Sequence, residues 1–311
     1  MLTVGFIGLG NMGGAAARNL QRAGFPLVVH DLRQEAAATL IEHGATWAGS
    51  PAEVIAACDA VVTMVFGPKQ VAEVVRGEHG LLSVDCTDKI WIDMTTSSPV
   101  LMRELAAEFE AAGGLPVDAP VTGSVDSAIR GDMIIFVGGK DDHVERTMPM
   151  LRAMGEPRMV GGYGNGYVAK LVNNQLWKIH AAAIGEAMVT AKLAGLEPDV
   201  WWAAMKGGAA DSFVMQHDVP SIFAGHYDPS FRLALCLKDL GLIEELMVSV
   251  GTRSELTQAT YARFREAAAR YGENAGEMTV CKVIEDDAGV ELRVAGDWVE
   301  PWKVQHPAEQ G

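Results

Sequence analysis

The sequence predicts an α/β domain followed by an all-α domain, with one long helix joining them. As far as residue 163, short apolar runs alternate with helical patterns, which is typical of βαβ units and a mainly parallel sheet. After the glycine-rich segment GGYGNG at 161–166, the chain reads as helical to about Tyr271. The first of these helices is about 28 residues long and apolar nearly all round, which is typical of a buried helix.

The individual elements of the first region follow from these patterns. We expect strands at 3–8, 26–30, 60–66, 90–94, 115–121 and 133–139. We expect helices at 12–23 and 34–43, and one starting near Pro51 with Ser50 as its N-cap. Another is expected within 97–112, with Pro99 in its first turn and Gly113 after its end.

Four regions are expected along the chain: the α/β domain at 1–163, the joining helix at 164–195, a helical domain at 196–275 and a tail at 276–311. The tail contains TVCKVIEDDAGVELRV at 279–294, in which β-branched residues flank a turn-like Asp-Asp-Ala-Gly. We therefore expect a β-hairpin there.

Composition excludes several classes of protein. The formal net charge of −15 over 311 residues argues against nucleic acid or an anionic membrane as the main partner, although it allows a small anion in a local positive pocket. The four cysteines are scattered, and the eight histidines lack metal-ligand spacing, so we expect no disulfide framework and no metal site. The start of the chain does not read as a signal peptide, and no apolar run reaches transmembrane length. We expect a cytoplasmic protein.

A glycine motif at the N-terminus indicates a dinucleotide site. Gly8, Gly10 and Gly13 have the spacing G-x-G-x-x-G, directly after an apolar strand and at the start of a helix. Asp31 closes the next strand, 23 residues after Gly8, which completes the fingerprint of a Rossmann domain. The first glycine allows the tight turn, the second lets the pyrophosphate approach the backbone, and the third lets helix and strand pack closely. The helix N-terminus then offers N–H groups to the phosphates.

Asp31 also bears on the choice of cofactor. A carboxylate at this position accepts hydrogen bonds from the adenosine ribose and repels a 2′-phosphate. Arg33, two residues later, is a candidate to stack on the adenine or to pair with a phosphate. The sequence favours NAD over NADP.

Two lysines on apolar helices have no acid among their helical neighbours at i±3 and i±4. They are Lys170 and Lys238. A lysine on a helix usually forms a local ion pair or lies in solvent. Because these two lysines have no acid within one helical turn and lie on apolar helices, we interpret them as ligands of one anion between them. Asn174 lies one helical turn after Lys170 and on the same face.

Four stretches in this order resemble the β-hydroxyacid dehydrogenase family, which includes 3-hydroxyisobutyrate dehydrogenase and tartronate semialdehyde reductase. GFIGLGNMG (5–13) resembles its N-terminal signature, and DAPVTGS (118–124) resembles its substrate loop. GNGYVAKLVNN (164–174) resembles its catalytic segment, and FRLALCLKDL (231–240) resembles its late helix. The resemblance spans residues 1 to about 275 and has no counterpart for the tail.

The resemblance implies substrate roles for particular residues. Lys170 is implied as the general acid/base that exchanges a proton with the substrate hydroxyl or carbonyl, with Asn174 holding the substrate. Thr122 and Gly123 are implied as the carboxylate site, through a hydroxyl and a backbone N–H. A lysine amine serves as a base when burial or neighbouring cations bring its pKa toward the working pH.

Further residues are implied near the cofactor. Lys238 is implied to contact the nicotinamide end and the substrate, with Asp239 supporting it. The positions implied to contact the dinucleotide are Gly8, Gly10, Asn11, Met12, Gly13, Asp31, Arg33, Val65, Phe66, Gln70 and Thr96.

The chain departs from the family pattern at two positions of the substrate loop. Thr122 replaces the usual serine, so the hydroxyl survives but the extra methyl narrows the pocket. Ser124 replaces the usual second glycine, which bears on the backbone conformation of the loop.

We therefore expect an NAD(P)-dependent dehydrogenase of small β-hydroxy acids, forming a homodimer or homotetramer, with its active site between the two domains. Candidate substrates are 3-hydroxyisobutyrate, glycerate with tartronate semialdehyde, and serine. The alternatives are an imine reductase, which usually has another residue in place of the lysine, and a non-catalytic cofactor-binding scaffold, which loses it. A phosphogluconate-type enzyme would require a longer helical domain and a histidine beside the lysine. Lys170 and the KLVNN segment argue against all three.

Overall fold

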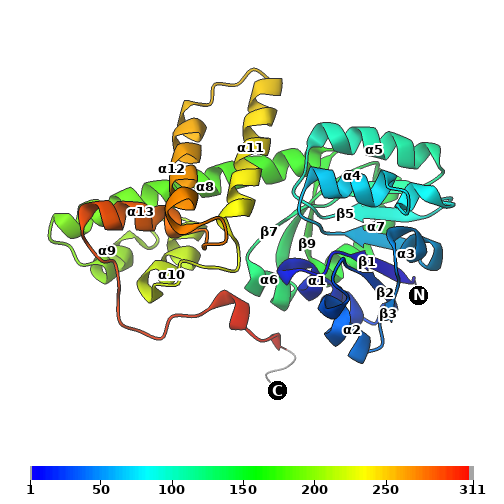
Figure 1. The fold of residues 1–311 in the computed structure, drawn as a ribbon, viewed down its shortest axis with the longest axis horizontal. Helices are drawn as coiled ribbons and strands as arrows, with labels where there is room; N and C mark the ends of the chain where they lie inside the picture. The colour runs from blue at the N-terminus through cyan, green and yellow to red at the C-terminus, as the bar shows by residue number, and fades with distance from the viewer. Residues whose placement is uncertain (1, 308–311) are drawn as a thin grey trace. The chain divides into compact units, whose positions relative to one another are not determined.

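The computed structural model describes residues 2–307, which divide into two compact units (Figure 1). The described part of the first unit is residues 2–171 with 305–307, and the second unit is residues 172–304. Helix α8 (Asn165–Leu193) is 29 residues long and belongs to both units, since the division falls at residue 171. The predicted fold class, an α/β region followed by a helical region with a long helix between them, is confirmed.

The first unit is built on one sheet, which has nine strands within the described residues. Strand order is β3-β2-β1-β4-β5-β6-β8-β7, and β9 also pairs with β8. The first six strands of that order are parallel to their neighbours, whereas β8 runs antiparallel to β6 and β7. The strands are β1 (Val4–Ile7), β2 (Leu27–His30), β3 (Thr46–Trp47), β4 (Ala60–Thr63), β5 (Ile90–Asp93), β6 (Leu115–Asp118), β7 (Val121–Thr122), β8 (Met133–Gly138) and β9 (Gly155–Gly161).

Helices cover both faces of this sheet. One apolar core joins the sheet to α1 (Asn11–Arg22), α2 (Ala38–Glu42), α6 (Val125–Arg130) and α7 (Asp141–Met154). The other core joins it to α3 (Pro51–Ala57), α4 (Pro68–Arg76) and α5 (Pro99–Ala111). Adjacent residues of β1 serve opposite faces: Phe6 packs in the first core and Ile7 in the second, as the two-residue repeat of a strand requires.

Each of the six predicted strands contains an observed one, although the segment 115–121 divides into β6 and β7. Ser50 caps α3 as predicted, with its side chain accepting a hydrogen bond of 3.2 Å from the Glu53 amide. Short one-turn 3-10 helices occur at Gln34–Ala37, Leu81–Ser83 and Pro301–Lys303. The elements that the sequence patterns missed are β3, α4, α6 and β9.

The second unit consists of helices around one apolar core. After α8 come α9 (Pro198–Met205), a π-helical turn at Val214–Asp218, α10 (Val219–Ala224), α11 (Leu233–Ser249), α12 (Glu255–Tyr271) and α13 (Thr279–Ala288). Among the described residues, no helix is long and apolar enough to cross a membrane.

The predicted hairpin at 279–294 is wrong, because Thr279–Ala288 forms helix α13. Val280, Cys281 and Val283 are buried in the core of the second unit. Burial of this face outweighs the weak preference of β-branched residues for strands. The Asp-Asp-Ala-Gly segment ends the helix instead of turning a hairpin, since Gly289 adopts a φ of +63° at the C-cap.

Candidate functional site

The parallel strands of the first unit place the predicted cofactor residues at one edge of the sheet. β1 lies between β2 and β4, so the chain leaves β1 at the point where the strand order reverses. Ligands of open α/β sheets bind at such a point, beyond the carboxyl ends of the strands. The glycine loop follows β1, Asp31 follows β2, Val65 follows β4 and Thr96 follows β5.

The three glycines of the loop meet different constraints. Gly8 has a φ of +95°, and a Cβ there would lie 2.2 Å from the Met64 carbonyl oxygen. A Cβ at Gly13 would lie 2.1 Å from the Gly8 carbonyl oxygen, so helix α1 approaches the turn as closely as glycine allows. Around Gly10, by contrast, no described atom lies within 4 Å of an added Cβ.

This loop fits the pyrophosphate of a dinucleotide. Gly10 is the N-cap of α1, and no side chain among the described residues caps it. The first N–H groups of a helix need acceptors, and the space beside Gly10 leaves room for an anion to supply them.

Asp31 connects the glycine loop to the end of β2. Its Oδ2 accepts a hydrogen bond of 2.7 Å from the Leu9 amide, and its Oδ1 accepts one of 2.9 Å from the Arg33 amide. A carboxylate has about four lone-pair sites, so acceptor capacity remains for ribose hydroxyls. Arg33 itself is exposed.

The other predicted cofactor residues lie beyond β4 and β5. The Val65 amide donates to Thr95 Oγ1 at 3.1 Å, which ties the two loops together. Phe66 is 44% exposed. Gln70 lies in the first turn of α4, and Thr96 is the third residue after β5.

Two buried aspartates hold the first turn of α8. Asp93 and Asp118 are the last residues of β5 and β6, and their Cα atoms are partners across the two strands. Asp118 accepts hydrogen bonds from the amides of Gly164 at 2.9 Å and Tyr167 at 3.2 Å. The hydroxyl of Tyr167 donates to Asp93. Lys170, three residues after Tyr167, therefore projects from a helix whose start is fixed to the sheet.

Burial changes the acidity of both carboxyls. Desolvation raises the pKa of Asp118 to about 7. The hydrogen bonds that its carboxylate accepts from backbone N–H groups act in the opposite direction and lower the pKa. Desolvation also raises the pKa of Asp93, although hydrogen bonds from Thr63, Tyr167 and Thr95 oppose it.

The backbone of residues 122–124 explains one of the two departures from the family pattern. Gly123 has a φ of +124°, and a Cβ there would come within 2.9 Å of Ser127 Cβ, so glycine is required. Ser124 has an extended backbone with a φ of −97°, which any residue adopts, and it is the N-cap of α6. A serine at 124 is therefore compatible with the loop. Thr122 ends β7, where it pairs with Ile134 of β8.

The second unit holds a buried polar cluster around Asp239 of α11. Asn174 Nδ2 donates to Asp239 Oδ2 at 2.7 Å, and Lys178 Nζ lies 3.3 Å from the same oxygen. Lys238 Nζ lies 3.0 Å from Asp239 Oδ1. We call Asn174, Lys178, Lys238 and Asp239 the Asp239 cluster.

The Asp239 cluster corrects one expectation and adds one residue. Lys238 was expected to lack an acidic partner, but the neighbouring Asp239 supplies one, which a test of i±3 and i±4 positions cannot detect. Lys178 was not predicted at all. Its signal was present, since Lys178 follows Asn174 by four residues on the same helix and hence shares its face.

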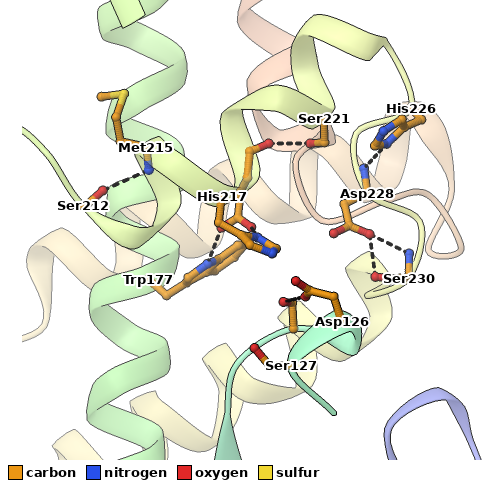
Figure 2. Close-up of polar contacts among 12 residues, drawn as sticks. Asp126, Ser127, Trp177, Ser212, Met215, His217, Ser221, His226, Asp228 and Ser230 are labelled. Carbon is orange, nitrogen blue, oxygen red and sulfur yellow. Dashed lines mark hydrogen bonds and ion pairs between the residues drawn. The ribbon is translucent and has the colours of Figure 1, made fainter. Parts of the chain in front are cut away.

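A second group of acids lies in the same unit. Asp218, Asp228 and Glu277 each offer a carboxylate oxygen, and these oxygens lie within 4.8 Å of one another. Asp228 Oδ1 accepts hydrogen bonds from the Ser230 amide and hydroxyl, as Figure 2 shows. Asp218 accepts from Trp177 Nε1 at 2.8 Å and pairs with His217, and burial raises its pKa.

The cysteines take no part in these clusters. All four are buried thiols, and none of the described residues forms a disulfide. Burial raises the pKa of Cys58 to about 12, so this thiol stays protonated as a core residue.

Comparisons with known proteins match both regions of the chain. Residues 3–164 match the NAD binding domain of 6-phosphogluconate dehydrogenase, and residues 164–284 match the NAD-binding domain of NADP-dependent 3-hydroxyisobutyrate dehydrogenase. Mitochondrial 3-hydroxyisobutyrate dehydrogenase of Mus musculus is 35% identical over 80% of this chain and 77% of its own length. 3-Sulfolactaldehyde reductase of Escherichia coli is 35% identical over 78% of this chain and 82% of its own.

Solved structures of related proteins share the fold of this chain. The 3-hydroxyisobutyrate dehydrogenase of Mycobacterium tuberculosis, solved with L-serine, is 29% identical with a TM-score of 0.82, covering 91% of this chain and 99% of that one. An imine reductase of Myxococcus stipitatus is 17% identical with a TM-score of 0.60, over 90% of this chain and 99% of that one, which shows a shared fold alone.

The fold and the glycine loop thus define an oxidoreductase that uses a nicotinamide dinucleotide. More narrowly, the chain belongs to the 3-hydroxyisobutyrate dehydrogenase family, and it is an NAD(P)-dependent hydroxyacid dehydrogenase acting on CH–OH donors.

The buried state of Asp118 predicts a pH dependence of stability. Its pKa is about 7 in the folded protein against an ordinary 3.8, so between these values the folded protein holds a proton that the unfolded chain releases. The stabilisation is present in full below pH 3.8 and is lost as pH rises to about 7. Relative to Asp118→Asn, the free energy of unfolding of the wild type should therefore gain up to ~4 kcal/mol from pH 7 down to pH 4.

Urea unfolding at a series of pH values measures this difference. Asp85→Asn is the matched control, because its hydrogen bonds to Thr87 lower the pKa of this exposed aspartate and move its effect below pH 3.8. A difference between wild type and Asp118→Asn that stays constant from pH 4 to pH 7 would contradict the account.

Proposed function

We propose that this enzyme oxidises the 3-hydroxyl of a small β-hydroxy carboxylic acid, or reduces the corresponding carbonyl, with Lys170 as the general acid/base. The observation that carries the proposal is the placement of Lys170 and Asn174 on one face of α8, a helix fixed at its start by Asp118 and held at Asn174 by Asp239. Catalytic groups need this kind of fixed geometry to act on one bound molecule.

Lys170 moves the proton in this proposal. In the direction of oxidation its neutral amine takes the hydroxyl proton, and in reduction its ammonium returns a proton to the carbonyl oxygen. The bound nicotinamide, when present, supplies the hydride chemistry. Asn174 orients the reacting oxygen: because Asp239 can only accept, the Asn174 NH2 group faces it, and the amide oxygen, which also accepts from Asn173 at 3.2 Å, is left to face other donors.

Thr122 and Gly123 recognise the substrate carboxylate, and Lys238 contacts the nicotinamide end and the substrate, with Asp239 supporting it. A threonine hydroxyl and a backbone N–H are donors, and a lysine ammonium adds charge, which is the combination that a carboxylate requires. The positive φ of Gly123 supports this assignment, since it sets the backbone of the loop in a conformation restricted to glycine.

The names of the relatives support a small, anionic substrate. Those proteins are named for 3-hydroxyisobutyrate and 3-sulfolactaldehyde, and one was solved with L-serine. We propose a substrate of the same size, with 3-hydroxyisobutyrate, glycerate and serine as the first candidates. The extra methyl of Thr122 favours the smaller members of this set.

We propose NAD as the preferred cofactor, held by Asp31 at the ribose, the glycine loop with Asn11 and Met12 at the pyrophosphate, and the loops after β4 and β5. The domain at 1–163 would hold it, and the helical region at 196–275 would serve the substrate and dimerisation. Exposed apolar side chains of the second unit support a homodimer or homotetramer; they include Leu176, Leu193, Val200, Val248 and Leu256. Buried thiols without disulfides support a cytoplasmic location.

Replacing Lys170 with alanine tests the general acid/base. We expect kcat to fall by about 10²–10⁴-fold, because the hydroxyl proton loses its acceptor. The NAD dissociation constant, measured by calorimetry, should change by less than about threefold, since the lysine acts on the alcohol. Lys192→Ala is the control on the same helix, where Lys192 is paired with Glu197 at 2.5 Å. A Lys170→Ala enzyme with near-normal kcat would contradict the assignment of Lys170 as the general acid/base.

Replacing Asp31 with alanine tests the selection of NAD. The change removes an acceptor for the ribose and the charge that repels a 2′-phosphate, so the ratio of kcat/KM for NAD to that for NADP should fall by about 10-fold or more. Steady-state rates with both cofactors give the ratio, and Asp85→Ala, an exposed aspartate elsewhere in the unit, is the control. An unchanged ratio would show that Asp31 is not the selector.

A further inference from the structure

A buried polar network joins the ends of β4 and β5 to the first turn of α8. Asp93 closes β5, Thr63 closes β4, Thr95 follows β5 by two residues and Tyr167 lies in α8. All four side chains are at most 1% exposed. We call these four residues the Asp93 network. A buried carboxylate needs hydrogen-bond partners, because removing it from water is costly, but none of the four is assigned a contact with cofactor or substrate.

The two threonine hydroxyls donate to the same oxygen of Asp93. Thr63 Oγ1 lies 2.6 Å and Thr95 Oγ1 lies 2.7 Å from Asp93 Oδ1. Each hydroxyl also meets a group that can only donate. The Trp91 indole N–H donates to Thr63 at 3.0 Å, and the Val65 amide donates to Thr95 at 3.1 Å. Since a hydroxyl has one hydrogen, that hydrogen points at Asp93 in both cases.

The other oxygen of Asp93 serves a different element. Oδ2 accepts a hydrogen bond from the hydroxyl of Tyr167, which lies three residues before Lys170 on α8. Desolvation raises the pKa of Tyr167, and the nearby Asp93 charge adds to this effect, so the phenol keeps its hydrogen and remains the donor. One carboxylate therefore bonds through Oδ1 to the ends of β4 and β5, and through Oδ2 to the helix that carries Lys170.

These two sides are the parts that must act on the substrate together. In the proposed function, the loops after β4 and β5 hold the cofactor through residues such as Val65 and Thr96, and α8 carries Lys170. During oxidation the hydride leaves the substrate carbon for the nicotinamide, and the proton leaves the oxygen on that carbon for the Lys170 amine. A misplacement of about 1 Å between reacting groups costs on the order of 100-fold in rate, so the two sides need a fixed spacing.

We propose that Asp93 is a positioning residue that couples the cofactor loops to the helix of Lys170. When a dinucleotide orders the loops after β4 and β5, the Asp93 network transmits that order to the first turn of α8 and holds Lys170 in place for proton transfer. Tyr167 is the link on the helix side, and Thr95 is the link on the loop side. This inference rests on the proposed function, in which Lys170 is the general acid/base.

Tyr167→Phe tests the coupling, because it removes the hydroxyl and keeps the ring. We expect the rate of nicotinamide reduction in a single turnover to fall by about 10-fold or more, with the Kd of NAD and the KM of the acid within about threefold of the wild type. Tyr163→Phe is the matched control. It removes a hydroxyl just before α8 that bonds to Glu110 at 2.9 Å and to His143 at 2.8 Å, instead of to Asp93. An unchanged rate in Tyr167→Phe, or an equal loss in Tyr163→Phe, would overturn the proposal.

Variants of Thr95 test whether the effect passes through Asp93. Thr95→Val removes the hydroxyl and keeps the shape of the side chain, whereas Thr95→Ser keeps the hydroxyl and should be the faster of the two at saturating NAD. If both links act through one carboxylate, Thr95→Val with Tyr167→Phe should be about as slow as the slower single variant. Independent effects multiply, so a double variant whose loss equals the product of the two single losses would overturn the proposal. So would a Thr95→Ser enzyme that is no faster than Thr95→Val.

Hydrogen exchange tests the same coupling without turnover. Saturating NAD should slow the exchange of the amides at 167–171 in the wild type and have no such effect in Tyr167→Phe. If the wild type oxidises no hydroxy acid, the proposed function is wrong, and this measurement still decides the inference. Amides that NAD does not slow in the wild type, or slows equally in Tyr167→Phe, would overturn it. If Tyr167→Phe does not fold, Thr95→Val provides the same comparison.

Discussion

The structure of the proposed site depends on the hydrogen bonds that Asp118 accepts from the first turn of α8. The carboxylate is fully buried at the end of β6, where the amides of Gly164 and Tyr167 reach it. These hydrogen bonds fix the start of the helix that carries Lys170. Burial raises the pKa of Asp118, because an ionised carboxyl is costly to remove from water.

A second buried carboxylate, Asp239, holds side chains of the helical unit in place, as Asp118 holds the first turn of α8 in the first unit. It accepts from Asn174 and pairs with two lysines, so a single oxygen pair determines the orientation of an amide and the location of two charges. Removing one partner of such a cluster leaves an uncompensated charge, which is more damaging than losing a surface ion pair. The proposed chemistry therefore relies on two acids that themselves transfer no proton to the substrate.

The features that could be predicted from the sequence act through backbone or local spacing. The glycine loop is of this kind, since Gly8 and Gly13 are set by contacts a few residues away, and Asp31 closes the next strand. The shared helix face of Lys178 and Asn174 could be read from their spacing, but the pairing of Lys178 with Asp239 could not, because Asp239 lies 61 residues further along the chain. The hairpin expected in the tail failed for a related reason: burial of Val280 and Val283 against other helices outweighs local preference. Lys238 was misjudged because only helical neighbours were considered, whereas its partner is the adjacent residue.

The most direct test of the account is turnover by the purified enzyme on a panel of 3-hydroxy and 2-hydroxy acids, each with NAD and with NADP, following formation of the reduced nicotinamide. The account predicts that at least one small 3-hydroxy acid is oxidised, faster with NAD than with NADP, and that the matching 2-hydroxy acids are poor substrates. Binding of NAD without oxidation of any 3-hydroxy acid would contradict it.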